Sequence, residues 1–433
     1  MTTMLPPDHP ERSLLADEAH ARPPQALQAP LRATHLAVLV PADEHPAELA
    51  HLDDLCGRFS AAAPPPGARH FSARLGPLHV KWERHGEFSG YTFVVEGAGS
   101  SVFGEPAAAL LPPGWLAAVP GQTIVAAHAE LLPAGATAPD AATLADHFEG
   151  HTAVGAVIGD GAALAFSDFR VHADGCARFL VFDRELTPRQ AGRTLQRLFE
   201  IEAYRMLALL ALPLARAQAT RVVTIEQSLA ALTGAIAGGA TGAAGSGDDE
   251  ALLHELTRLA AEVENGLAAS QFRFGACKAY AELVGTRIAE LREQRLPGLQ
   301  TIEEFMARRF TPAVATCVTV SQRLHDLSER VAQASALLST RVDIARERQN
   351  QALLASMDRR AHLQLRLQQT VEGLSVAAIT YYTVGVIGYV AKGLKAGGLA
   401  IDPELTAGLA VPVVALAVMW GLRRARRHLG QVD

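Results

Sequence analysis

The sequence contains few charged residues, and its few cysteines are not paired. Charged residues make up 19% of the 433 positions, and the net charge is −6. With no basic block before the C-terminus, a nucleic acid is a poor candidate partner. The cysteines stand singly, as Cys56, Cys176, Cys277 and Cys317. This scatter forms neither a disulfide framework nor a zinc-binding signature, and it is typical of a reducing compartment.

Targeting and catalytic motifs are also missing. Residues 1–10 have no apolar core, so they are not a signal peptide, and we expect the bulk of the chain in the cytoplasm. The segment GAVIGDG at 155–161 lacks the lysine of a phosphate-binding loop, and there is no Gly-x-Ser-x-Gly elbow. Four histidines lack metal-ligand spacing: His128, His147, His151 and His172. We therefore expect no metal, no cofactor and, more generally, a non-enzymatic role.

Four aspartates follow or separate the later strand patterns: Asp160, Asp168, Asp174 and Asp183. Carboxylates gathered in space bind hard cations through their oxygens. Aspartates are also common in turns and at strand ends for local reasons. The sequence favours this second, structural interpretation.

Two long runs near the C-terminus contain no charge at all. They cover residues 373–391 and 405–422. As helices, both approach the roughly 30 Å thickness of a bilayer's hydrocarbon core. A pair of buried core helices is the alternative. We predict a two-helix transmembrane hairpin over 373–422, followed by a basic cytoplasmic tail over 423–433.

Arginines after the second run fix the expected orientation. They are Arg423, Arg424, Arg426 and Arg427. Cytoplasmic ends of membrane helices carry such an excess, whereas the short loop between the runs is balanced in charge. We expect a protein of the bacterial inner membrane with two helices and both termini in the cytoplasm.

A polar stripe follows the first uncharged run. Ser375, Tyr382 and Tyr389 recur every seven residues and share one helix face. The stripe fits either packing against another helix or the lining of a pore. Because neither run contains an ionisable side chain, a proton-relay transporter is disfavoured.

The residues before the hairpin divide by pattern. Residues 1–185 predict an α/β domain around one sheet. Its expected strands are 33–40, 78–83, 87–95, 123–130, 152–158, 162–171 and 176–183, with helices at 45–59 and 140–148. Residues 186–372 predict a helical stalk with a flexible linker near 234–249. The expected fold is thus an α+β cytoplasmic domain, a long-helix region and the transmembrane hairpin.

A heptad-like seam marks the last part of the stalk. Its apolar members are Leu324, Leu327, Val331, Ala334 and Leu338. Their three- and four-residue steps are typical of a coiled coil, which would join copies of the chain. A hairpin with another helix of the same chain would bury the same seam.

Two polar clusters are candidates for a site. His20 and Arg22 form the first, where a histidine beside carboxylates fits a base, a metal ligand or a salt-bridged terminal segment. The second lies on a predicted hairpin and consists of Lys81, Glu83, Arg84 and His85. Strand alternation places Lys81, Glu83 and His85 on one face and Arg84 on the other. Cross-strand ion pairs on a solvated face explain this cluster, and a ligand or anion site is the alternative.

Several strings resemble a bacterial family of membrane-anchored proteins, domain of unknown function 3422. They are EAHARP at 18–23, KWERH at 81–85, YTF at 91–93, FEIEAYRM at 199–206 and TVEGLS at 370–375. The resemblance implies membrane anchoring and no particular activity. The order of domains is also similar to CorA-type cation channels. Their Gly-Met-Asn signature is absent, however, because residues 388–393 read GYVAKG.

Together these features favour a self-associating scaffold or sensor held in a lipid bilayer. The seam and hairpin motivate self-association into a homo-oligomer, and no catalytic constellation is assembled in the sequence. One alternative is a CorA-like oligomeric ion channel. Another is a membrane-tethered enzyme that uses the clusters around His20 and His85.

Overall fold

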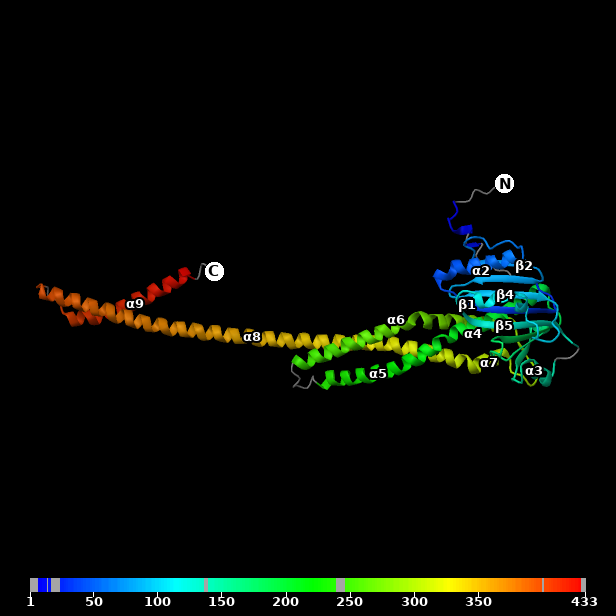
Figure 1. Ribbon diagram of the computed structural model, residues 1–433. Helices are drawn as coiled ribbons and strands as arrows, with labels where there is room; N and C mark the ends of the chain where they lie inside the picture. The colour runs from blue at the N-terminus through cyan, green and yellow to red at the C-terminus, as the bar shows by residue number, and fades with distance from the viewer. Residues whose placement is uncertain are drawn as a thin grey trace. The chain divides into compact units, whose positions relative to one another are not determined.

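The structure is a computed structural model. It describes residues 7–13, 15–16, 24–135, 139–238, 246–398 and 401–429, and Figure 1 shows its elements. The chain divides into two compact units, Met1–Ser335 and Ala336–Asp433. The first unit contains the sheet and most helices, and the second contains the apolar helices.

A single sheet of nine strands organises the first unit, in the order β2-β3-β4-β1-β5-β8-β7-β6-β9. The strands are β1 (Leu31–Leu39), β2 (His70–Leu75), β3 (Leu78–Arg84), β4 (Ser89–Glu96), β5 (Gln122–Pro133), β6 (Val154–Ile158), β7 (Ala163–Ser167), β8 (Ala177–Asp183) and β9 (Gln294–Arg295). Only the β5–β8 pairing is parallel, and the other neighbours are antiparallel. The predicted mixed α/β sheet and its hairpin at 78–95 are therefore confirmed.

Helices cover both faces of the β1–β3–β4 region. On one face, α2 (His45–Arg58) packs Leu52 and Leu55 against Trp82 and Phe93, all fully buried. On the other face lies α4 (Pro188–Leu209), which starts with a capping box formed by Thr187 and Gln190. The short helix α3 (Ala141–His147) precedes β6. Short 3₁₀ turns lie at Ala42–Glu44, Ala107–Leu110, Leu116–Ala118 and Gly159–Gly161.

A layer of long helices continues from α4 in the first unit. It consists of α5 (Ala211–Gly238), α6 (Ser246–Leu291), α7 (Ile302–Arg309) and the beginning of α8 (Thr311–Ala396). Helix α6 packs against both α4 and α5. Of the expected linker, residues 234–238 are helical, α6 resumes at Ser246, and 239–245 lie outside the described residues.

The apolar seam of α8 is buried by helices of the same chain. Leu324, Leu327, Val331 and Ala334 are each at most 4% exposed. Arg323 pairs with Glu226 of α5 at 2.5 Å, and the Ser328 hydroxyl donates to Glu264 of α6 at 2.8 Å. Of the two predicted ways to bury the seam, packing within one chain is therefore present in the first unit.

The second unit contains the C-terminal part of α8 and the helix α9 (Pro403–Leu429). Both helices include a segment that is long and apolar enough to cross a membrane. Many of their large apolar side chains are exposed, among them Tyr381, Val386, Leu405 and Val413. Pro412 lies inside α9, where a membrane helix tolerates it.

Candidate functional site

A pocket lies between the sheet and α4 in the first unit. Its floor comes from β1, β3 and β4, and its roof comes from α4. The titratable side chains that line it are His35, Lys81, Glu83, His85, Glu200 and Tyr204. The ammonium Nζ of Lys81 lies 3.0 Å from Oε1 of Glu83, and both side chains are only 15% exposed. Strand alternation thus placed Lys81, Glu83 and His85 correctly on one face.

Burial shifts the acid–base properties of the pocket. The pKa of His35 is lowered to about 3, first by burial and then by the nearby charges of His85 and Lys81. Its ring stacks on Phe199, and its Nδ1 lies 2.9 Å from the Thr92 hydroxyl. Burial also raises the pKa of Tyr204 to about 12. His35 is therefore neutral at physiological pH.

Arg84 belongs to a different network, on the opposite face of the sheet. Its Nη2 donates to Oε2 of Glu48 at 2.7 Å. The indole of Trp82 and the hydroxyl of Tyr91 both donate to Oε1 of Glu48 at 2.9 Å. Glu48 is fully buried, so these three donors satisfy a carboxylate inside the core. Arg84 therefore stabilises the fold and does not line the pocket.

The N-terminal candidates His20 and Arg22 lie outside the described residues. The next described residues do reach the pocket, because Gln25 and Leu27 line it. The Leu27 amide donates to the carbonyl of Pro188 at 2.9 Å. A Cβ on Gly192 would lie 1.7 Å from the carbonyl oxygen of Gln25, so only glycine allows this close approach.

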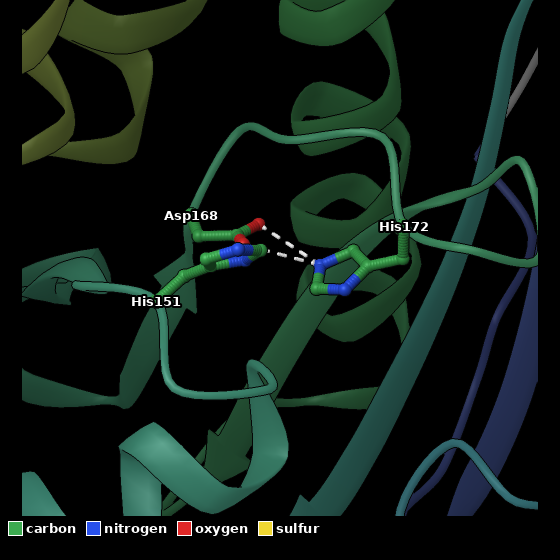
Figure 2. A group of neighbouring side chains, drawn as sticks. All are labelled: His151, Asp168 and His172. Atoms are coloured by element: carbon green, nitrogen blue, oxygen red, sulfur yellow. Dashed lines mark hydrogen bonds and ion pairs between the residues drawn. The ribbon is translucent and has the colours of Figure 1, made fainter.

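A second cluster lies in the loops around β6 and β7, and Figure 2 shows its three side chains. His151 precedes β6, Asp168 directly follows β7, and His172 lies in the loop to β8. Oδ2 of Asp168 is 3.0 Å from Nδ1 of His151 and 3.1 Å from Nε2 of His172. The side chains of Asp168 and His172 are fully buried, whereas that of His151 is 36% exposed.

Glu149 and Arg178 support this cluster from one side. Oε2 of Glu149 lies 3.2 Å from the other ring nitrogen of His172, and Oε1 accepts from Arg178 at 2.7 Å. The adjacent ring of His172, and then the charge of Arg178, lower the pKa of Glu149. The backbone amide of Arg170 donates to Oδ1 of Asp168 at 3.1 Å.

The histidine spacing alone gave no sign of this cluster. His151 and His172 both lie next to Asp168, in an arrangement that could hold a metal ion. The expectation that the aspartates have only structural roles did not include this arrangement. His128 instead contacts the Thr34 hydroxyl at 3.0 Å, and Asp160 pairs with Arg292 at 2.5 Å. His151, Asp168 and His172 lie in two separate loops, so no local sequence pattern reveals the cluster. The antiparallel pairing of β6 and β7 brings together the loop before β6 and the loop after β7.

The residues proposed for the membrane part lie in the second unit. Tyr382 and Tyr389 are more than 70% exposed, and the Ser375 hydroxyl donates to the carbonyl of Val371 at 2.9 Å. Arg424 lies over the ring of Trp420 at 5.4 Å. Arg423 continues α9, as do Arg426 and Arg427, whose side chains are not described. The tyrosine stripe is thus uncovered within the described chain.

Comparison with known proteins gives one match. The family model described as Protein of unknown function (DUF3422) matches residues 7–429. No curated protein and no solved structure matches the chain. The similarity to CorA-type channels stays a prediction. Because the family model spans nearly the whole sequence, the chain belongs to the DUF3422 family.

Proposed function

We propose that this chain is a membrane-anchored sensor or scaffold of the bacterial inner membrane. The end of α8 and the helix α9 cross the bilayer, and the sheet unit faces the cytoplasm. The exposed apolar surface of these two helices is the observation that carries the proposal. Tyr381, Val386, Leu405, Leu409 and Val413 are each 60% exposed or more.

The cost of leaving this surface in water supports a lipid environment. Burying a leucine or valine side chain stabilises a protein by about 1.5–3 kcal/mol. Both helices expose such residues along a span that matches a bilayer. Burial of the same residues by lipid removes the cost without any further partner.

The charge distribution supports cytoplasmic ends. Four arginines follow the apolar part of α9, whereas the loop before α9 carries both signs of charge. We expect Gly398→Cys in intact cells to react with a membrane-impermeant maleimide, and Val432→Cys to react only after lysis. Labelling of Val432→Cys in intact cells would reverse the orientation. Labelling of both variants only after lysis would exclude a spanning hairpin.

The pocket supports a sensing role for the sheet unit. The adjacent ammonium of Lys81 and carboxylate of Glu83 complement a small molecule with a carboxylate and an ammonium group. We expect one or more of the proteinogenic amino acids, at millimolar concentration, to raise the melting temperature of the detergent-solubilised protein. Lys81→Met removes this rise, and Arg74→Met, at an exposed surface position, keeps it. If no amino acid changes the melting temperature, this sensing role is wrong.

Self-association distinguishes the scaffold from a channel. Two helices are too few to enclose a pore, so a CorA-like channel requires a ring of several chains around the face of Ser375, Tyr382 and Tyr389. Light scattering with the detergent mass subtracted gives the number of chains in each particle. A discrete ring of about five chains favours the channel and calls for flux assays in proteoliposomes. A dimer favours the scaffold, and a monomer contradicts self-association.

A tethered enzyme is the remaining alternative, and His85 in the pocket is its best candidate residue. A turnover measured on any substrate and lost in His85→Gln would establish it in place of the scaffold.

A further inference from the structure

We propose that His151, Asp168 and His172 bind a divalent transition-metal ion, with zinc as the best fit. This site is separate from the pocket under α4, and it does not depend on the proposed sensing role. The ligand atoms are Nδ1 of His151, an oxygen of Asp168 and Nε2 of His172. They lie within 4.8 Å of one another, and Figure 2 shows the three side chains next to one another.

The distances fit a small ion. Zinc binds imidazole nitrogen and carboxylate oxygen at about 2.0–2.2 Å, so neighbouring ligand atoms in a tetrahedral site lie about 3.3 Å apart. The carboxylate oxygen Oδ2 of Asp168 lies 3.0 and 3.1 Å from the two histidine nitrogens. An ion can therefore be accommodated with small side-chain movements.

The surroundings of His172 point to an ion more directly, because its buried Nδ1 makes no hydrogen bond in the structure although Glu149 lies 3.2 Å away. Each ring nitrogen of His172 faces a carboxylate, Asp168 on one side and Glu149 on the other. A neutral imidazole has one N–H, so it can donate to only one of them. The lone pair of the other nitrogen would then point at a negatively charged carboxylate. This arrangement is unfavourable because the His172 side chain is fully buried.

A metal ion resolves this conflict. Nδ1–H of His172 donates to Glu149, and the lone pair of Nε2 binds the ion beside Asp168. A carboxylate that holds a metal-binding histidine in this way is common in zinc sites. Arg178 holds Glu149 in place at 2.7 Å.

The loops that carry the ligands are fixed by backbone hydrogen bonds. The amide of His172 donates to the carbonyl of Cys176 at 3.0 Å, and the amide of His151 donates to the carbonyl of Phe148 at 2.9 Å. The partial exposure of His151 leaves the outer side of the cluster accessible to solvent. Three protein ligands with water in the remaining position are the usual composition of a zinc site that is open to a substrate.

The test is metal binding by the full-length protein in detergent, after removal of metal with a chelator. We expect titration calorimetry to show one Zn²⁺ bound per chain. Co²⁺ bound in place of Zn²⁺ should give the visible absorption of a four-coordinate site. His151→Gln weakens Zn²⁺ binding at least tenfold, and Glu149→Gln weakens it about 10–100-fold. His147→Gln, at a histidine four residues from His151, leaves the affinity unchanged.

His151→Gln is the decisive variant because His151 is partly exposed and its loss is compatible with folding. A melting curve confirms that each variant is folded. The proposal is overturned if folded wild-type protein binds no Zn²⁺. It is also overturned if His151→Gln binds Zn²⁺ as tightly as the wild type, because the ion then lies elsewhere.

Discussion

At the scale of single residues, the buried carboxylate of Glu48 offers the clearest test of the fold. Removing Arg84 leaves this charge in the core with two neutral donors, Trp82 and Tyr91. Loss of one partner of a buried ion pair costs about 3–5 kcal/mol. We expect Arg84→Ala to lower the free energy of unfolding by about 3 kcal/mol, measured by denaturant titration.

The matched control is Arg74→Ala. Arg74 also pairs with a carboxylate, but its side chain is 66% exposed. Exposed ion pairs contribute about 0–1 kcal/mol, so this variant should be nearly as stable as the wild type. Equal losses in the two variants would contradict the role given to Glu48.

His35 predicts a pH dependence of stability. Its pKa is about 3 in the folded protein, because burial disfavours the charged ring, and about 6.5 in an unfolded chain. Between these values only the unfolded state takes up the proton, so stability is complete above pH 6.5 and falls as the pH falls towards 3. The slope is about 1.4 kcal/mol per pH unit, or roughly 2 kcal/mol between pH 6.5 and 5.

The variant His35→Gln isolates this contribution from those of other histidines. We expect wild-type protein to lose about 2 kcal/mol more than His35→Gln when the pH is lowered from 7 to 5. The exposed residue His70 provides the control, and His70→Gln should follow the wild type. If the plots of unfolding free energy against pH are parallel for the wild type and His35→Gln, His35 takes up its proton as readily in the folded protein as in the unfolded chain, and the prediction is wrong.

Residue patterns predicted the candidate sites only where the residues share one strand. The alternation along β3 correctly separated Lys81 and Glu83 from Arg84. Glu200 reaches the same pocket from α4, which no local pattern indicates. His151 and Asp168 come from different loops, and only the pairing of β6 with β7 brings them together.

At the scale of elements, the sequence predicted strands with a strong apolar pattern. The expected strand 33–40 is β1, and the expected pair 78–83 and 87–95 is β3 and β4. β2 was missed because it is an edge strand whose residues are largely half-buried or exposed. β9 has only two residues and forms by pairing with β6 far along the chain, so it has no periodicity to detect.

The buried seam of α8 gives a test at the same scale. Leu327 is 1% exposed, whereas Val318 on the same helix is 49% exposed. Leu327→Ala should lower the free energy of unfolding by about 2–5 kcal/mol, since it leaves a cavity. Val318→Ala should change it by less than about 0.5 kcal/mol. Light scattering should give the same particle mass for both variants, and dissociation by Leu327→Ala would instead indicate a seam between chains.

At the scale of the whole molecule, apolar exposure is concentrated in one unit. Large exposed apolar residues are scattered singly through the first unit, as at Leu110 and Phe272, and such scatter is normal for a soluble surface. In the second unit they follow one another along α8 and α9. The apolar surface on which the proposed membrane anchor rests is therefore found in the second unit.

This division predicts that a chain of residues 24–335 is soluble without detergent. The cut removes Leu338 but leaves the other four seam residues, Leu324, Leu327, Val331 and Ala334, packed on the helices of the first unit. We expect the truncated chain to stay in the supernatant after ultracentrifugation, and a chain of residues 24–429 to sediment with membranes. A truncated chain that sediments although it is folded by circular dichroism would place a membrane contact on the sheet unit. Solubility together with an unchanged Zn²⁺ affinity would show that the sheet unit folds and builds its metal site without the anchor.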